Sequence, residues 1–176
     1  GSVIEQSSML HLSIGIWLHY SNSNIVSDNI VSNCGWCGVL LCGGSSENNI
    51  TRNMLNGNGN GLGLTGMNNL IYHNNFIANQ NQTMMLLSFR NTWNNSCEGN
   101  YWSDNNGTVF NRYGIADTSY TIDANNQDNY PLKSPYILGD VNHDGKVTII
   151  DIYIMAKAFE TRPGDERWIP YADVDE

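Results

Sequence analysis

Charged residues are scarce in the first half of this 176-residue sequence. Residues 1–96 contain three acids and two arginines, and the first lysine is Lys133. Fourteen of the 17 acidic residues follow residue 97, so two chemically different segments are joined. The net charge of −9 and the isoelectric point near 4.6 argue against nucleic acid or an anionic membrane as a partner. The sequence also lacks a run of about 18 apolar residues, so we expect no transmembrane span.

Asparagine is unusually abundant, with 27 residues, and there are 17 glycines. Such a composition can indicate disorder, but 40% of the residues are apolar and they recur at regular intervals. The tetrapeptides that recur with a period of 23 residues are GIWL (15–18), GVLL (38–41), GLGL (61–64) and MMLL (84–87). Short apolar runs separated by Asn, Gly and Ser, repeated every 20–25 residues, are typical of parallel β-helix coils. The sequence therefore predicts an all-β solenoid, a parallel β-helix of about four 23-residue coils.

Equivalent residues of successive coils are expected to stack about 4.8 Å apart. The 23-residue register predicts two inward ladders, Ile16–Val39–Leu62–Met85 and Leu18–Leu41–Leu64–Leu87. Asn29, Asn53 and Asn75 are expected at a corner, where Asn tolerates left-handed geometry and its amide can bond along the stack. The same alignment places Gln6, Asp28, Arg52 and Asn74 in one outward column.

The repeats NIVSDNIVSN and NNITRNML resemble the coils of right-handed parallel β-helix proteins of the pectate-lyase-like type. The stretches EGNYWSD (98–104) and GIADTSYTIDANNQDNYPL (114–132) resemble the region that closes many archaeal surface β-helices. Those proteins are similar to the periplasmic β-helix proteins of nitrous-oxide-reductase maturation. The resemblance covers roughly residues 3–136, and it implies a right-handed helix at an archaeal cell surface.

The stretch GDVNHDGKVTIID (139–151) has the pattern of a calcium loop. A hard cation needs six to eight oxygens around one point, and a glycine at position 6 permits the sharp turn that brings them together. Gly145 holds that position, and an amphipathic helix is expected after the loop. The predicted Ca²⁺ ligands are Asp140, Asn142, Asp144, Lys146 through its carbonyl, and Asp151 at the twelfth position.

An Asp at the twelfth position makes this segment resemble a dockerin, a pair of calcium loop–helix units that binds cohesin domains. Asp173 lies 33 residues after Asp140, and Asp173 and Asp175 match positions 1 and 3 of a second, incomplete loop. We therefore expect the sequence to be part of a longer chain, and half a dockerin to bind cohesin poorly. The expected divisions are β-helix coils at 1–98, a closing segment at 99–137 and the first half of a dockerin-like module at 138–176.

The four cysteines, Cys34, Cys37, Cys42 and Cys97, leave two interpretations open. In an extracellular chain they predict one or two disulfides or buried thiols. Alternatively, His11 stacks on Cys34 and His19 on Cys42 in the repeat register, as in a thiolate–imidazole site for copper or zinc. Sequons that permit N-glycosylation occur at Asn49, Asn81, Asn94 and Asn106.

The coils offer few groups for acid–base catalysis, so enzymatic activity is disfavoured and no catalytic residue is assigned. Asp28 beside Arg52 is expected to be a surface ion pair worth under about 1 kcal/mol.

The first functional hypothesis is a non-catalytic, extracellular module at the cell surface. It would bind other copies of itself, another surface protein or a polysaccharide, and its first coil, which has no cap, could support end-to-end filaments. An alternative is the C-terminal part of a polysaccharide lyase, epimerase or glycoside hydrolase. A third hypothesis is a periplasmic copper-handling protein.

Overall fold

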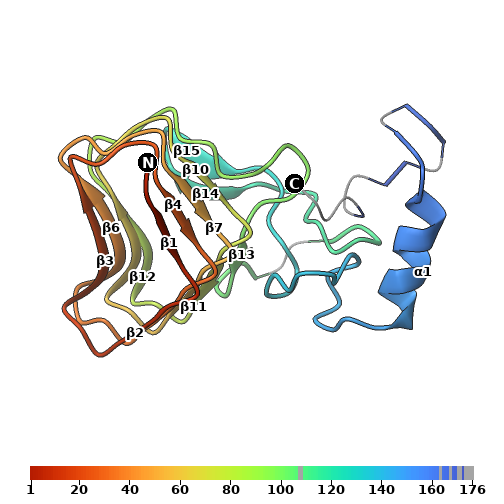
Figure 1. Ribbon diagram of the computed structural model, residues 1–176, viewed down its shortest axis with the longest axis horizontal. Coiled ribbons are helices and arrows are strands. Elements are labelled where there is room, and N and C mark those ends of the chain that lie inside the picture. The colour runs from red at the N-terminus through yellow and green to blue at the C-terminus, as the bar shows by residue number, and fades with distance from the viewer. Residues whose placement is uncertain (107–108, 163, 167, 170–171, 173–176) are drawn as a thin grey trace.

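The computed structural model describes residues 1–106, 109–162, 164–166, 168–169 and 172. It confirms the predicted parallel β-solenoid of about four turns, in which three sheets each take one strand from every coil (Figure 1). The first sheet contains β1 (Val3–Glu5), β4 (Ile25–Ser27), β7 (Asn49–Thr51) and β10 (Leu70–Tyr72). The second contains β2 (Ser8–Leu10), β5 (Ile30–Ser32), β8 (Met54–Asn56), β11 (Asn75–Ile77) and β13 (Tyr101–Trp102). The third contains β3 (Ile14–His19), β6 (Cys37–Cys42), β9 (Asn60–Leu64) and β12 (Asn81–Met85).

The inward ladders of the third sheet follow the predicted register over three coils, because Ile16 pairs with Val39 and Val39 with Leu62. In the fourth coil the predicted register is wrong by two residues. Leu64 pairs with Met85, and Leu87 is 95% exposed instead of completing a ladder. The physical reason is a shorter turn: five residues lead from Leu64 to the next stacked asparagine, Asn69, whereas seven lead from Leu41 to Asn48.

The core lies inside the coils, where inward side chains of neighbouring strands stack on one another. Val26, Ile50 and Ile71 occupy equivalent places in the first sheet, and each has no exposed surface. Full burial of such a side chain stabilises the fold by about 1.5–3 kcal/mol. The repeat therefore adds a similar increment of apolar burial with every coil.

Asparagine ladders run along the corners. In one ladder, the side-chain and backbone N–H groups of Asn53 both donate to Asn74 Oδ1 at 3.0 Å, and those of Asn74 donate to Asn100. The expected member Asn75 is thus replaced by Asn74. The sequence analysis expected the asparagine itself to have left-handed geometry, but the residue before each asparagine has it, as at Arg52 (φ 55°) and His73 (φ 58°). The asparagine side chain points inward, where it stacks on the next one. Two further ladders join Asn24, Asn48, Asn69 and Asn91, and Asn58 and Asn79.

Aromatic rings close the end of the coils. Phe76 stacks on Trp102 at 4.2 Å between ring centroids, and Trp102 stacks on Tyr120 at the same separation. Tyr120 begins the antiparallel pair β14 (Tyr120–Asp123) and β15 (Asn126–Asp128). The carboxylate of Asp128 accepts hydrogen bonds from Asn100 N and Trp102 Nε1, so it ends the ladder that contains Asn100.

Beyond the closing segment lies α1 (Ile149–Ala158), at the end of the molecule opposite the first coil (Figure 1). The helix begins with a capping box, because Thr148 and Asp151 bond each other's backbone N–H. No helix in the described ranges is long and apolar enough to cross a membrane.

Candidate calcium-binding and docking site

The predicted calcium loop leads from the closing segment into α1. Asp140, at position 1, is 3% exposed, and its carboxylate oxygens accept hydrogen bonds from Asp144 N at 3.2 Å and Gly145 N at 2.8 Å. Gly145 has a φ of +91°, which glycine adopts at little cost, so the chain turns sharply here. Burial raises the pKa of Asp140, although the two N–H donors partly oppose that effect.

Positions 3 and 5 lie on the same turn. Asn142 Oδ1 accepts from Asp144 N at 3.0 Å, and Asp144 Oδ1 accepts from Lys146 N at 3.1 Å. The loop thus gathers three side chains that carry oxygen, while the carbonyl role of Lys146 stays a prediction.

Asp151, at position 12, is fully buried and joins the two ends of the loop. Its Oδ1 accepts from Val141 N at 3.0 Å, and its Oδ2 accepts from Thr148 N at 2.7 Å. Burial alone would raise the pKa of Asp151, but the hydrogen bonds from Thr148 and Val141 outweigh it, and the pKa is lowered. The carboxylate is therefore held ionised at the base of the loop.

The residues present fit calcium by their chemistry, because the loop offers hard oxygen donors and a glycine turn. Within the described residues, no three Asp, Glu, His or Cys side chains converge as a metal cluster. The predicted second-loop residues Asp173 and Asp175 lie outside the described part of the chain.

The fourth residue of the loop, His143, attaches the loop to the β-helix, which the sequence analysis did not predict. His143 is 1% exposed, and its Nδ1 lies 2.9 Å from Tyr113 O, which can only accept, so Nδ1 is the donor. Its Nε2 lies 3.4 Å from Glu98 Oε1 without the alignment of a hydrogen bond. Glu98 Oε2 lies 2.6 Å from His73 Nε2, at the corner of the fourth coil. Burial lowers the pKa of His73, although Glu98 opposes this.

Further contacts support the same junction. Ser134 Oγ donates to His143 O at 2.7 Å, and the ring of Tyr136 stacks on His73 at 4.0 Å. The side chain of Asn75 binds both backbone groups of Tyr136, at 2.6 and 3.2 Å. The calcium loop is therefore packed against the last coil. His73 and Asn75 belong to the repeat, but their partners in the closing segment and the loop do not, which explains why the repeat gave no signal for these contacts.

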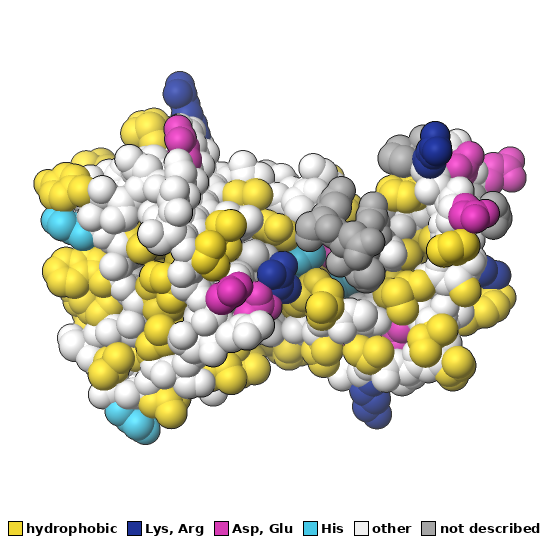
Figure 2. All heavy atoms as spheres, in the orientation of Figure 1, with side chains coloured by type: hydrophobic (Ala, Val, Ile, Leu, Met, Phe, Trp, Pro, Cys, Tyr) yellow, Lys and Arg dark blue, Asp and Glu magenta, His cyan; other side chains and the backbone are white. Residues whose placement is uncertain are grey.

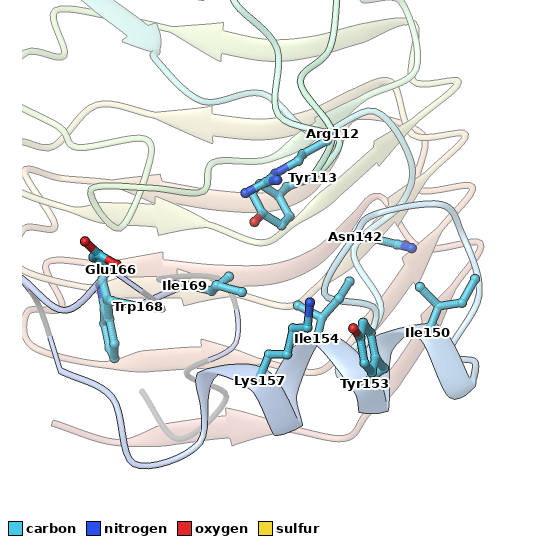
Figure 3. A pocket seen from close by; sticks show the side chains of 10 residues that line it. All are labelled: Arg112, Tyr113, Asn142, Ile150, Tyr153, Ile154, Lys157, Glu166, Trp168 and Ile169. Atoms are coloured by element: carbon cyan, nitrogen blue, oxygen red, sulfur yellow. The ribbon is translucent and has the colours of Figure 1, made fainter.

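The helix that follows the loop exposes most of its apolar side chains. Asp151 is its buried residue, whereas Ile149 is 74% exposed and Tyr153 is 57% exposed. A cavity of about 470 Å³ lies between α1 and the closing segment (Figure 3). Its lining residues are Arg112, Tyr113, Asn142, Ile150, Tyr153, Ile154, Lys157, Glu166, Trp168 and Ile169. The loop–helix therefore presents an apolar surface with charged side chains at its margin.

The four cysteines are free thiols in this structure. Two of them, Cys34 and Cys37, are buried thiols, which the sequence analysis allowed beside disulfides, and the possible disulfides stay a prediction. Cys34 and Cys37 are buried within the coil and bond the carbonyls of Ser32 and Val39, and burial raises the pKa of Cys37 to about 12. Cys42 is on the outer face of the coil, and Cys97 is in the loop beside Asn95.

The histidine–cysteine stacking is observed for one of the two predicted pairs. His19 pairs with Cys42 in the parallel register, and its Nδ1 lies 3.1 Å from Cys42 Sγ. His11 is exposed at a left-handed corner, whereas Cys34 points inward. The structure therefore brings together His19 and Cys42 but supports no site at His11.

The remaining predicted surface residues have clear positions. Arg52 binds Asp28 through two bonds of 2.9 Å, and the next residue in that outward column is His73, not the expected Asn74.

Among the four sequons, Asn81 and Asn106 are exposed, Asn49 is half-buried and Asn94 is 8% exposed. Glycosylation stays a prediction, and the exposed pair are its more accessible sites.

Two families match the chain. The family described as periplasmic copper-binding protein (NosD) matches residues 1–107, and the dockerin type I domain matches residues 138–176. Neither a curated protein nor a solved structure matches the chain. Dockerin type I domains bind calcium and mediate docking between proteins, as the loop–helix resemblance implied. Because the first match covers more than half of the sequence, the chain belongs to the NosD family of periplasmic β-helix proteins, and it carries a dockerin type I segment.

Proposed function

We propose that this chain is a non-catalytic docking module outside the cytoplasm, in which a β-helix scaffold presents a calcium-binding loop–helix to a protein partner. The observation that carries the proposal is the combination at residues 140–158. There a loop rich in oxygen ligands precedes a helix that leaves its apolar side chains exposed. The periplasmic family match and the dockerin match support a location outside the cytoplasm, at the cell surface.

Calcium would be held by the side-chain oxygens of Asp140, Asn142, Asp144 and Asp151 and by the carbonyl of Lys146. The bound ion would supply positive charge that favours the ionised form of Asp140, whose pKa burial raises. Loop N–H groups hydrogen-bond the carboxylates of Asp140, Asp144 and Asp151, so these side chains would have to turn toward one point to hold the ion.

The exposed side of α1 is the proposed docking surface. An amphipathic helix can lay its apolar side chains into a groove of a partner, and Ile149, Ile152 and Tyr153 are each more than half exposed. The partner is a second copy of the chain or another surface protein. In this proposal the coils at 1–98 and the closing segment at 99–137 act as the rigid support for the module at 138–176.

Calorimetric titration with Ca²⁺ tests the first step. We expect the wild type to have one site with a Kd of about 1 mM or tighter. The double variant Asp140→Ala/Asp144→Ala should bind no calcium. Asp117→Ala is the matched control, because Asp117 is an exposed acid outside the loop. A wild-type chain that binds no calcium, or an equal loss in the control, contradicts the proposed site.

Light scattering in calcium and then in chelator tests the second step. If the wild type forms dimers in calcium and Ile152→Asp stays monomeric, the partner is a second copy of the chain. A monomer in both conditions would exclude self-association and leave another surface protein.

A further inference from the structure

A thiol with two nitrogen neighbours lies on the outer face of the third sheet, at the end of the molecule away from α1 (Figure 1). Trp17 and His19 extend from β3, and Cys42 extends from the neighbouring strand β6. Trp17 Nε1 lies 2.9 Å from Cys42 Sγ, and His19 Nδ1 lies 3.1 Å from the same sulfur. Two nitrogens of different chemistry therefore contact one sulfur.

The two nitrogens can act on the sulfur in complementary ways. The indole N–H of Trp17 can only donate, so it stabilises negative charge that develops on the sulfur. The imidazole of His19 can present a lone pair at Nδ1, so it can take the proton of the thiol. A nucleophile and a base within about 2.6–3.2 Å of each other have the geometry of an activated nucleophile. Cys42 and His19 meet this condition.

Access from solution separates Cys42 from the thiols inside the coil. Cys42 is half-buried, and its partner His19 is exposed. Cys34 and Cys37 are buried, and burial raises the pKa of Cys37 to about 12, so that thiol stays protonated. Reactive cysteines are partly exposed and lie beside groups such as histidine, whereas buried structural cysteines are inert. Cys42 has the first of these two environments.

We propose that Cys42 is a nucleophilic thiol that exchanges with small disulfides from solution and then carries the mixed disulfide. The sulfur of Cys42 attacks one sulfur of the disulfide while its proton passes to His19 Nδ1. A bond forms between these two sulfurs and the original disulfide bond breaks. The second sulfur leaves as a thiolate and takes the proton from His19. One disulfide is consumed and one thiol is released, so the exchange needs no further oxidant.

The surroundings of the sulfur favour a small disulfide without net charge. Residues 1–96 carry three acids against two arginines, so the coils are almost neutral. Trp17 is 59% exposed and Tyr20 is 75% exposed, and the ring of Tyr20 packs edge-on against His19 at 4.3 Å. Aromatic surface thus lies beside the thiol. Disulfides also persist outside the cytoplasm, where the proposed docking module would be located.

Reaction of the full chain with dithiodipyridine, a neutral aromatic disulfide, tests the proposal. Intact-mass spectrometry counts the adducts, and the absorbance of the released pyridinethione gives the rate. At pH 7 we expect one fast adduct on the wild type. Cys42→Ser should abolish this adduct, and His19→Gln should slow its formation at least about tenfold.

Cys97→Ser is the matched control. Cys97 is half-buried like Cys42, but its sulfur lies 3.4 Å from Asn95 Oδ1, an amide oxygen that cannot serve as a base at neutral pH. The Cys97→Ser variant should therefore react as fast as the wild type.

The pH dependence separates a base from a merely structural role. A thiol in water ionises at about pH 8.5, so at pH 10 the attack no longer needs a base. The deficit of His19→Gln should therefore shrink to about twofold or less at pH 10, whereas a loss caused by altered packing would persist. Because His19 is exposed, its replacement should leave the coils folded, which circular dichroism checks.

Two results would overturn the proposal. If Cys42→Ser still forms the fast adduct, another cysteine is the nucleophile. If His19→Gln matches the wild type at pH 7, or stays equally slow relative to it at pH 10, His19 is not the base. The calcium-loop variant Asp140→Ala should react at the wild-type rate, so failure here and failure of the docking proposal can be distinguished.

Discussion

The β-helix and the calcium module bury their side chains in opposite ways. Val26, Ile50 and Ile71 lie inside the coils with no exposed surface, whereas Ile149 and Phe159 of the module are more than 70% exposed. Charge is divided in the same direction, since acidic and basic side chains gather around α1 and few lie over the coils (Figure 2).

The difference shows that the two regions obtain order from different sources. Each coil is stabilised by its neighbours, through stacked apolar side chains and asparagine ladders. The loop–helix has little core of its own and is held by hydrogen bonds within the loop and by the buried contact of His143. We therefore expect the coils to respond to changes in packing, and the module to respond to its ion.

The largest expected effect comes from breaking a ladder with Asn53→Ala. Asn53 is fully buried, and its Oδ1 accepts from both the backbone and side-chain N–H groups of Asn29. Because buried donors left without partners cost about 1–3 kcal/mol each, we expect the free energy of unfolding to fall by about 3–5 kcal/mol. Urea denaturation measures this change.

Asn81→Ala is the control for the ladder. Asn81 is an exposed residue of the same β-helix with one side-chain bond, to Asn60. We expect a loss of about 0.5 kcal/mol or less. Equal losses at Asn53 and Asn81 would show that the ladders do not stabilise the coils.

The next effect concerns pH and Asp128, where burial raises the pKa from 3.8 to about 6. The folded state therefore binds more protons than the unfolded state between about pH 4 and pH 6, and this group's contribution to stability falls as pH rises through that window. The expected loss is about 3 kcal/mol, since one pKa unit corresponds to about 1.4 kcal/mol.

Asp128→Asn removes this dependence, although it loses an acceptor for Tyr130 N. The difference in urea midpoint between wild type and variant, measured at pH 4.5 and pH 7, isolates the group because His73 titrates in both proteins. A difference that does not change with pH would contradict the buried carboxylate.

A third effect links the two regions. Calcium at 100 times its Kd should stabilise the module by about 2.7 kcal/mol, and amide hydrogen exchange over 140–158 should slow accordingly. Through His143, the protection should extend to Glu98 and His73 in the wild type. In His143→Ala, calcium should slow amide exchange in the loop and helix alone. Ser134→Ala, which removes one bond to the loop backbone, should have a smaller effect.

The smallest effect is expected at the surface ion pair. Arg52 and Asp28 are joined by two bonds, but their side chains remain 30% and 35% exposed. Arg52→Ala should therefore cost about 1 kcal/mol or less, and the cost should shrink in high salt. A loss above about 2 kcal/mol would show that this corner behaves like the buried ladders.

The sequence by itself determined the features that depend on local, repeated patterns. Apolar alternation at a 23-residue period predicts the stacked sheets, because the apolar positions within each strand identify the side chains that face the core. The ligand spacing from Asp140 to Asp151 likewise predicts the loop and the helix after it.

The tertiary structure decided the features that depend on turn length and on contacts between distant segments. A turn shortened by two residues shifted the fourth coil, which moved Leu87 to the surface and placed Asn74 in the ladder. The contact of His143 with Glu98 joins residues 45 positions apart. No period encodes such contacts, because they form only once the coils are stacked and the closing segment has folded back over their end.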